Sequence, residues 1–560
     1  MDHDSATAKI AIIGLGPRGL GALEALATLS RHADTPLRVD VFDPFPAKGA
    51  GPNFDPAESP TCLLNIPFRD IAIGAPAFSR CGNFADWLDR QVDPDSFPPR
   101  ADLGRYLEAR LADLTGLGLL AVTFRHAPVD RVTQVAGGWQ LEAGGAAHGP
   151  YAEVLLTVGQ PAVTPDPQLA AWQDHAGQTG AILTDAYPAH RLTAMAADWT
   201  GKTVAIRGMA LSAFDILRVL TTGQGGRFQQ GRYLASGREP ALILPFSLDG
   251  RPPYPKPATA ALDAGFDPLQ AETDAFSAAM ATAVNATPDV AEQVITAALV
   301  PVIRRLLQAH DAKKDEDAIQ TWLKAEWSSP GTQETGTPPE ILSQGIALAQ
   351  GHLPPSIGYA VGQVWRKWQN ALRASYNSAA LAPQTAKTIL GFDEGLKRYS
   401  YGPPLASSME LRALLDCGLV DLELCADPGI NLTQTGWTLS AGTRSALADV
   451  MVDGVMDPPD VSRIRAAPIK GLVEAGRIVP LGQDLAAHIA PDGQLWDDKG
   501  RLQPGLCLLG RLASGSVIAA DSLHDCFGRA ADRWAEGVVR RLGGMGAQRA
   551  SDPAHPLDED

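Results

Sequence analysis

A glycine-rich turn between a short apolar run and a helical pattern constrains the fold of this chain more than any other feature. Residues 9–14 (KIAIIG) predict a buried strand that stops at glycine, and a helical pattern follows over residues 18–31. The turn carries Gly14, Gly16 and Gly19 in the spacing GxGxxG. The first glycine permits a tight turn, the second lets the backbone approach a pyrophosphate, and the third lets the helix pack closely on the strand. The turn therefore predicts a dinucleotide site at a helix N-terminus, which favours anions.

The next predicted strand supports a nucleotide at this turn. Residues 37–43 (LRVDVFD) alternate between apolar and polar side chains and end at Asp43. A carboxylate at the end of this strand is well placed to accept hydrogen bonds from an adenosine ribose. A lone GxGxxG is a weak signal, but its position between strand and helix, followed by this aspartate, predicts a bound dinucleotide.

A second segment repeats the order of strand, tight turn and helix. It covers residues 203–220, and its turn begins at Gly208 and includes Ser212. Ala210 and Ala213 stand where the first turn has glycine, and a methyl group hinders close approach of a phosphate. The repeat predicts a second nucleotide unit, and the two alanines leave open that this unit no longer binds nicotinamide.

An arginine beyond this second turn suggests which nucleotide it would take. Arg238 follows a strand predicted near residues 232–235. An arginine just past the second strand of such a unit pairs with the 2′-phosphate of NADPH, whereas an acidic residue there selects NADH. The sequence therefore predicts NADPH, with NADH as the alternative.

The length of the chain calls for several lobes, because 560 residues exceed what one hydrophobic core usually serves. Two nucleotide units in one chain indicate a flavoprotein, with FAD on the first unit and a nicotinamide donor on the second. The predicted fold class is α/β, a two-dinucleotide-binding (Rossmann-like) flavoprotein with a helical insertion or cap. The predicted domains are 1–165 (FAD-binding, first part), 166–266 (NAD(P)-binding-like), 267–400 (helical insertion or cap), 401–545 (return to the nucleotide-binding lobes and FAD contact) and 546–560 (flexible tail).

Composition disfavours several other classes of protein. The chain has 63 acidic and 47 basic residues and a formal net charge of −16, so neither nucleic acid nor anionic membrane is an expected partner. No apolar run approaches the roughly 18 residues of a membrane-spanning helix, and the polar N-terminus does not suggest a signal peptide. The six cysteines form no CxxC pair and the eleven histidines show no ligand spacing, so no metal site is predicted. We therefore expect a soluble cytoplasmic protein.

Several short segments carry a resemblance to a known family. They are GLGPRG at 14–19, the VFDP end of the second strand, GAGPNF at 49–54, LLNIP at 63–67, RADLGRYL at 100–107, VLLTVGQP at 154–161, RGMALSAFD at 207–215, ASGREP at 235–240 and LLGRLASGSVIAADSL at 508–523. With these segments the chain resembles the FAD/NAD(P)-binding family that includes FAD-dependent urate hydroxylases and aspartate N-monooxygenases. Residues 267–400 carry no specific part of this resemblance.

The resemblance implies a set of cofactor contacts. They are Gly14, Gly16, Pro17, Arg18, Gly19, Asp43, Asn65, Gly159, Gly208, Ser212, Arg238, Gly510 and Asp521. Arg18 would add positive charge near the phosphates, and Asn65 would meet the flavin ring or the substrate, or else cap its loop. Gly510 and Asp521 would lie at the ribityl and pyrophosphate end of FAD, unless Asp521 is an ordinary surface residue.

The function implied by the resemblance is that of a flavin-dependent monooxygenase. NADPH or NADH would reduce FAD, and a flavin C4a-(hydro)peroxide formed with oxygen would hydroxylate a small polar substrate such as an amino acid or a purine. Because the cofactor carries this chemistry, the sequence names no catalytic residue. Lys256, Lys397 and Arg398 are candidates to pair with a substrate carboxylate, although each is by default a solvated charge.

Two alternatives stay open. One is a flavin reductase or oxidase of the same fold that never hydroxylates, and the other is a non-catalytic FAD-binding sensor that retains only the first nucleotide unit. The alanines at 210 and 213 favour the sensor slightly. The sequence leaves the oligomeric state undetermined.

Overall fold

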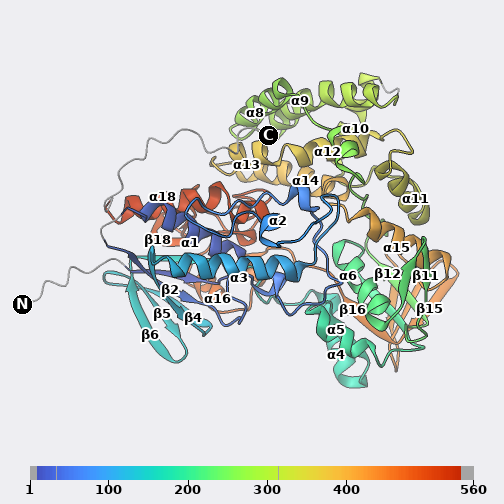
Figure 1. Ribbon diagram of the computed structural model, residues 1–560, viewed down its shortest axis with the longest axis horizontal. Coiled ribbons are helices and arrows are strands. Elements are labelled where there is room, and N and C mark those ends of the chain that lie inside the picture. Colours follow the sequence, from blue (N-terminus) through green and yellow to red (C-terminus); the bar gives the residue numbers. More distant parts are fainter. Residues whose placement is uncertain (1–8, 33–34, 313–314, 544–560) are drawn as a thin grey trace, which may run out of the picture.

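The computed structural model describes residues 9–32, 35–312 and 315–543. Two lobes with parallel sheets lie side by side, and a helical lobe packs above them in the view of Figure 1. The flexible tail predicted for residues 546–560 lies outside the described residues. Within the described ranges, no helix combines the length and the apolar character that crossing a membrane requires.

The first lobe is built on a six-stranded sheet in the order β17-β18-β7-β1-β2-β3. Its strands are β1 (Lys9–Ile13), β2 (Leu37–Phe42), β3 (Leu120–Arg125), β7 (Glu153–Leu156), β17 (Gln494–Trp496) and β18 (Leu502–Leu508). All neighbours pair in parallel except β17, which runs antiparallel to β18. The parallel order places the carboxyl ends of β1, β2 and β7 at one edge, where ligands of such sheets bind.

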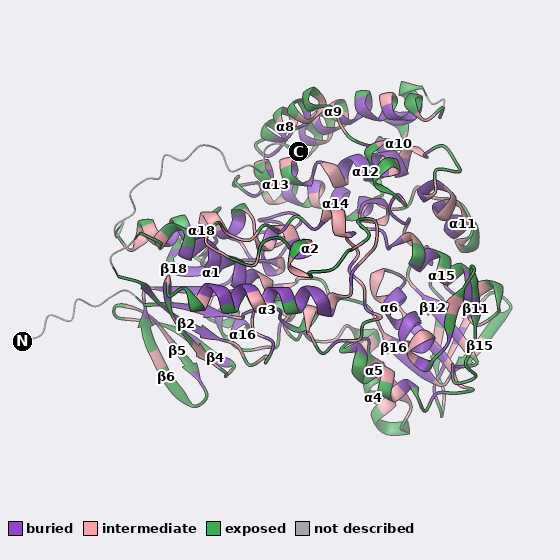
Figure 2. Ribbon diagram, in the orientation of Figure 1, coloured by how far each residue is buried: buried purple, intermediate pink, exposed green. Residues whose placement is uncertain are grey.

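Both faces of this sheet are covered, which explains why β1 and β7 are apolar after their first residues, Lys9 and Glu153. One face packs on α1 (Pro17–Ser30), α3 (Arg100–Gly116) and α18 (Arg529–Arg541), and the other on a meander of β4 (Val129–Val135), β5 (Gly138–Ala143) and β6 (Ala146–Tyr151). Side chains of β1 alternate between the two cores: Ile10 and Ile12 join the helices, whereas Ala11 and Ile13 join the meander. Figure 2 shows the buried faces of these helices turned towards the sheet.

The second lobe repeats this plan on a smaller scale. Its four strands are parallel in the order β12-β9-β16-β8, with β8 (Ile182–Asp185), β9 (Thr203–Arg207), β12 (Leu242–Phe246) and β16 (Val450–Asp453). Helices α5 (Ala189–Ala196) and α6 (Leu211–Leu220) cover one face. The other face carries α4 (Pro167–Thr179) and a meander of β13 (Gly429–Leu432), β14 (Trp437–Ala441) and β15 (Arg444–Ala448).

One predicted strand lies elsewhere than expected. The strand near residues 232–235 exists as β11 (Arg232–Leu234), but it pairs only with β10 (Arg227–Gln229) in a separate hairpin. The strand that lies beside β9 in the sheet is β12, which follows the hairpin. The prediction that β11 is the second strand of this unit is therefore wrong. The strand that pairs with β9 is set by the tertiary packing, and it is not the next strand along the chain.

The helical lobe forms its own core. Its helices are α7 (Ala260–Ala264), α8 (Gln270–Ala283), α9 (Pro288–Ala309), α10 (Glu316–Ser328), α11 (Pro338–Ala349), α12 (Ile357–Lys367), α13 (Gln369–Tyr376) and α14 (Pro383–Ser400). The next helix, α15 (Leu405–Asp416), leaves this lobe and buries its apolar side chains in the core of the second lobe. Stacked aromatic pairs, Phe276 on Trp368 and Trp327 on Phe392, fill that core at centroid distances of 4.2 and 3.9 Å. The tryptophans of this region are thus packing residues.

The chain after the helical lobe returns to both sheets. β16 enters the second sheet, and β17 and β18 then complete the first one. Two short helices, α16 (Ile469–Glu474) and α17 (Leu523–Cys526), belong to this return, and α2 (Phe84–Trp87) lies in the long loop after β2. The α/β class with two Rossmann-like units and a helical insertion is confirmed, while the domain boundaries given above stay predictions.

Candidate functional site

The first glycine turn lies at the carboxyl edge of the larger sheet. Gly14 has φ +98°, and its N–H donates to the carbonyl of Phe42, the last residue of β2, at 2.9 Å. A Cβ at Gly14 would clash with the carbonyl oxygen of Thr157, which directly follows β7, and the Thr157 hydroxyl donates to Gly14 O at 2.6 Å. The first glycine is thus required both by its backbone angle and by the strand beside it.

The other two glycines serve the helix that follows. Gly19 packs so close to the turn that a Cβ there would clash with the Gly14 carbonyl oxygen. Gly16 is the N-cap of α1, and the nearest atom to a Cβ there is the Gly51 Cα at 3.8 Å, so the approach to the helix N-terminus is open. Pro17 occupies the first helical position, where its missing N–H costs no hydrogen bond. The turn fits the pyrophosphate of a dinucleotide, because the helix dipole favours an anion here and a Cβ placed on Gly16 would meet no side chain within 4 Å.

Asp43 lies directly after β2, beside this turn. Its carboxylate accepts the Leu15 N–H and, at 2.7 Å, the N–H of Phe45. These bonds hold the carboxylate at the end of the strand, where a ribose would meet it. The ribose contact itself stays a prediction.

Arg18 is tied to a segment more than five hundred residues away in the chain. It is buried, its guanidinium forms an ion pair with Asp525 at 2.9 Å, and it donates to the carbonyl of Ala520 at 2.6 Å. Gly510, with φ +106°, lies against the same side chain, since a Cβ there would come 3.0 Å from Arg18 Cδ. The structure thus brings Arg18 and Gly510 together, but Asp525 already balances the positive charge that Arg18 was expected to offer to the phosphates.

Asp521 lies on the same return segment but faces the helical lobe. Its carboxylate pairs with Lys397 of α14 at 3.2 Å, and 29% of its side chain is exposed. Burial raises the pKa of Asp521, but the positive charges of Lys397 and Arg511, together with hydrogen bonds to the carboxylate, give a net downward shift of this pKa. Its proposed contact with FAD stays a prediction.

Gly159 follows β7 with φ +65° and has no atom near the position of a Cβ. Next to it, Gln160 accepts a hydrogen bond from Arg511 of the return segment at 3.0 Å. The crossing between the nucleotide units therefore contacts the same return segment as Arg18, which supports its place beside the first site.

The second turn keeps the backbone of the first. Gly208 has φ +113°, and its N–H donates to the carbonyl of Phe246, the last residue of β12, at 2.7 Å. Ala210 is the N-cap of α6. Ser212 lies in the first turn of that helix and packs close to Gly454, since a Cβ placed on Gly454 would lie 3.6 Å from the Ser212 Cβ. Ala210 therefore has a methyl group at the N-terminus of α6, where Gly16 has none at the N-terminus of α1. This methyl leaves less space for a phosphate to approach the helix N-terminus.

Arg238 does not lie at the end of the strand beside β9. It is exposed in the turn between β11 and β12, and its guanidinium covers Gly225. The neighbouring Glu239 closes this turn by accepting the Tyr233 hydroxyl at 2.6 Å and the Ser236 N–H at 2.7 Å. Arg238 was expected to follow the second strand of this unit, and that placement is wrong. The strand beside β9 is β12, and the residue that follows β12 is Ser247. A contact of Arg238 with NADPH stays a prediction.

A buried ion pair between the two lobes was not predicted. Arg100 of α3 pairs with Asp215 of α6 at 2.5 Å, and the Tyr187 hydroxyl donates to the same carboxylate at 2.6 Å. Asp215 is only 4% exposed. Both charged residues lie in segments that carry the resemblance, but a single sequence gives no signal that pairs residues so far apart.

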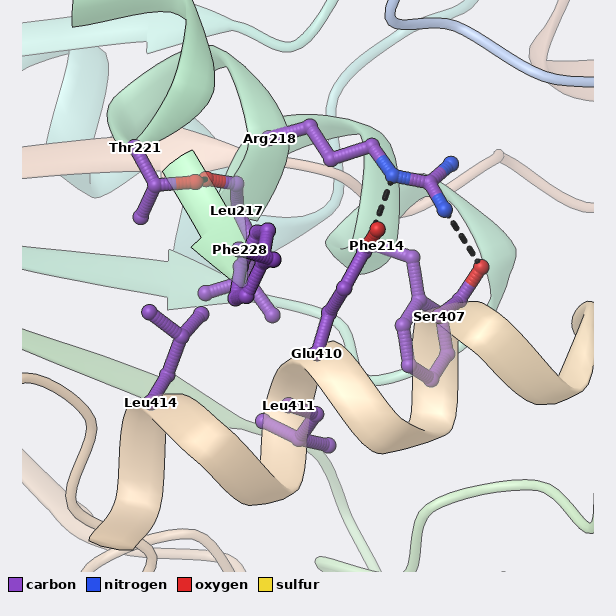
Figure 3. A pocket seen from close by; sticks show the side chains of 9 residues that line it. All are labelled: Phe214, Leu217, Arg218, Thr221, Phe228, Ser407, Glu410, Leu411 and Leu414. Atoms are coloured by element: carbon purple, nitrogen blue, oxygen red, sulfur yellow. Dashed lines mark hydrogen bonds and ion pairs between the residues drawn. The ribbon is translucent and has the colours of Figure 1, made fainter. Parts of the chain in front are cut away.

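A seam joins α6 of the second lobe to α15, the helix that follows the helical lobe (Figure 3). Arg218 donates to Glu410 and to Ser407, both at 2.8 Å, and the apolar side chains beneath them interlock. These side chains leave no room for a water-sized molecule. Through these contacts, α15 is held tightly against α6.

Comparisons with known proteins agree with this geometry. Residues 11–161 match the model of a family described as FAD-NAD(P)-binding. Two curated relatives are each 31% identical: a nitrosuccinic acid synthase of Aspergillus oryzae, over 42% of this chain and 39% of the relative, and an L-aspartate N-monooxygenase (nitrosuccinate-forming) of Streptomyces davaonensis, over 42% of each. The chain therefore spans about two fifths of the length of the curated relatives it matches.

Among solved structures, the Kutzneria sp. 744 ornithine N-hydroxylase with reduced FAD, NADP⁺ and L-ornithine shares the fold. The match has a TM-score of 0.50 and 13% identity and covers 96% of this chain and 99% of the other. The resemblance predicted from the sequence is confirmed by the match of residues 11–161 to the FAD-NAD(P)-binding family model and by the two curated relatives.

Proposed function

We propose that this chain is an FAD-dependent, NAD(P)H-using monooxygenase that hydroxylates the amino group of a small amino acid. The observation that carries this proposal is the first glycine turn, whose Gly16 leaves the N-terminus of α1 open to a pyrophosphate. The substrate class is taken from the curated relatives, one of which is named as acting on L-aspartate. A cytoplasmic location stays a prediction.

The cofactor would supply the redox chemistry, because reduced FAD reacts with oxygen and delivers one of its atoms. Gly14 and Gly16 would let the backbone approach the pyrophosphate, Gly19 would let α1 pack against the turn that holds it, and Asp43 would bind the ribose. Arg18 has a positioning role: through Asp525 and Ala520 it holds the return segment against the first turn. The buried Arg100–Asp215 pair keeps the two lobes in register, so that a nicotinamide on the second lobe can approach the first.

The two alternatives differ in whether nicotinamide dinucleotide binds at the second turn. If the Ala210 methyl excludes nicotinamide dinucleotide, the protein binds FAD without reducing it. If nicotinamide reduces FAD but no amino acid is oxidised, the protein is a reductase or oxidase. The monooxygenase, the reductase or oxidase, and the sensor each predict a different result in a single experiment.

That experiment is a visible absorption spectrum of the purified protein, followed by anaerobic addition of NADPH and then by oxygen with L-aspartate. Flavin bands that bleach with NADPH, together with an N-oxidised product, are the expected result. Bleaching without product would identify a reductase or oxidase, and bands that persist with aspartate present would favour the sensor. A protein that takes up no FAD would contradict the proposal outright.

A further inference from the structure

Lys256 is a buried lysine at the point where the three lobes meet. It lies in the loop between β12 and α7, and only 6% of the residue is exposed. Its ammonium donates to the carbonyl of Asn65 in the first lobe and, at 3.3 Å, to that of Gly402 just after α14. An ammonium has three N–H donors, so two carbonyls leave one donor for another acceptor.

No carboxylate in the described part of the chain lies within ion-pair distance of this ammonium. The nearby carboxylates are engaged elsewhere: Asp263 pairs with Arg366 and, at 2.8 Å, with Lys367, while Asp70 lies 3.6 Å from Arg366. Burying a cation without an anionic partner is costly, so a ligand anion that supplies the missing counter-charge would stabilise the charged form of Lys256.

The other two basic candidates differ from Lys256 in this respect. Lys397 has two carboxylate partners, Glu394 at 2.7 Å and Asp521 at 3.2 Å, and Arg398 pairs with Asp249. Their charges are already balanced within the protein. Of the three candidates, Lys256 alone has its charge unbalanced among the described residues.

The surroundings of Lys256 place it beside the segments assigned to the flavin. Asn65 belongs to the LLNIP segment, and the adjoining Asp70 carbonyl lies 2.9 Å from Nε2 of His524 on α17. That helix follows directly on the return segment that Arg18 holds against the first glycine turn. An anion at Lys256 would therefore lie near the place where substrate and flavin must meet.

We propose that Lys256 binds a carboxylate group of the amino-acid substrate. This inference rests on the proposed function, because it concerns the same site. The ammonium would supply the charge, and its third N–H the hydrogen bond, while the Asn65 and Gly402 carbonyls fix its direction. Charge-assisted bonds of this kind are among the strongest available to a small ligand.

A pH dependence follows from the surroundings of the ammonium. Burial and the positive charge of Arg366 lower the pKa of Lys256 to about 7, against the opposing effect of Asp70 and Asp263. The other charged or titratable groups facing it are Arg69 and His524, and burial lowers the pKa of His524, so that imidazole is neutral above pH 7. Since only the charged lysine binds a carboxylate well, affinity should fall as pH rises above about 7, and binding at pH 8 should take up a proton.

The test uses the FAD-loaded protein and succinate, a dicarboxylate that lacks the reacting amine. Titration calorimetry gives the Kd for wild type and for Lys256→Gln, which keeps N–H donors for the two carbonyls but has no charge. We expect the Kd to rise at least about tenfold in Lys256→Gln, as for loss of a charged hydrogen bond. Lys387→Gln is the matched control, because Lys387 forms only an exposed pair with Asp484, and it should bind succinate like wild type.

The flavin spectrum and NADPH bleaching, recorded on the same samples, separate this inference from the proposed function. Equal succinate affinity in wild type and Lys256→Gln would overturn the role of Lys256 even if NADPH bleaches the flavin normally. A changed flavin potential with unchanged succinate affinity would overturn it too, and would assign the lysine to the flavin. Calorimetry of wild type in buffers of different ionisation enthalpy needs no variant, and absence of proton uptake at pH 8 would contradict the inference independently.

Discussion

The two glycine turns share one backbone but differ in the side chains that face a ligand. In both, the first glycine has a positive φ, +98° at Gly14 and +113° at Gly208. In both, its N–H donates to the last residue of the neighbouring strand, Phe42 or Phe246. The N-caps that follow have almost the same angles, φ −83° and ψ −166° at the first turn, φ −82° and ψ −158° at the second. The frame of a dinucleotide site is thus present twice.

The two turns differ in how closely the following helix and a ligand can approach the backbone of the turn. Gly19 cannot accept a Cβ, because α1 lies against the Gly14 carbonyl, whereas Ala213 carries its methyl inside the core of the second lobe. Gly16 leaves the helix N-terminus open, and Ala210 places a methyl at the equivalent point. The two turns therefore share their backbone geometry and differ by one methyl group at the helix N-terminus, and the effect of this methyl on nucleotide affinity can be tested.

The largest effect on cofactor affinity is expected when a side chain larger than the Ala210 methyl of the second turn is placed at Gly16 in the first turn. Gly16→Val places a branched side chain where the pyrophosphate must lie, and we expect FAD affinity to fall by more than about a hundredfold. Flavin absorbance after incubation with FAD and removal of the excess measures it. Because the nearest atom to a Cβ is 3.8 Å away, thermal stability without FAD should change little, and wild-type flavin content would refute the assignment.

A smaller but structural effect is expected at the third glycine. Gly19→Ala forces α1 away from the strand, and we expect a loss of about 1–3 kcal/mol in unfolding free energy, as for overpacking a core. Urea unfolding followed by circular dichroism measures this loss. Gly116→Ala, in a helical position with open space around it, is the control and should not lose stability. Equal behaviour of the two variants would show that the close approach of α1 is not needed.

The preference for NADPH or NADH tests whether the end of β12 in the second lobe has the same role as the end of β2 in the first, namely to contact the adenosine ribose. Ser247 follows β12 as Asp43 follows β2. Ser247→Asp would place a carboxylate near the 2′-phosphate, and we expect the KM for NADPH to rise about tenfold relative to NADH. Arg238→Ala serves as the comparison, because Arg238 lies outside this strand end and should change the ratio less. If Arg238→Ala has the larger effect, the phosphate lies at the β11–β12 turn.

The smallest effect is expected when the second turn is made more like the first. Ala210→Gly removes the methyl at the helix N-terminus, and we expect NADPH to bind about two- to fivefold more tightly, less than one full hydrogen bond would give. Anaerobic flavin reduction at increasing NADPH concentration gives the apparent Kd. Unchanged or weaker binding would mean that the methyl of Ala210 does not limit the nucleotide.

Much of the first site could be predicted because its signals are local. The strand, the turn and α1 follow one another within about twenty residues, and Gly14, Gly16 and Asp43 lie where the pattern places them. The pairing of β12 with β9 could not be predicted in the same way. A hairpin intervenes between α6 and β12, and a residue count along the chain cannot distinguish an inserted strand from a member of the sheet.

The sequence by itself determined the α/β class, the two nucleotide turns and the candidate lysines and arginines, because periodicity, glycine spacing and charge are properties of short segments. Only the tertiary structure decided which charges are balanced. It paired Arg18 with Asp525 and Arg398 with Asp249, whereas among the described residues Lys256 has only carbonyl oxygens as partners. Whether a buried charge has a partner depends on residues brought together from distant parts of the chain, and that depends on how the lobes pack.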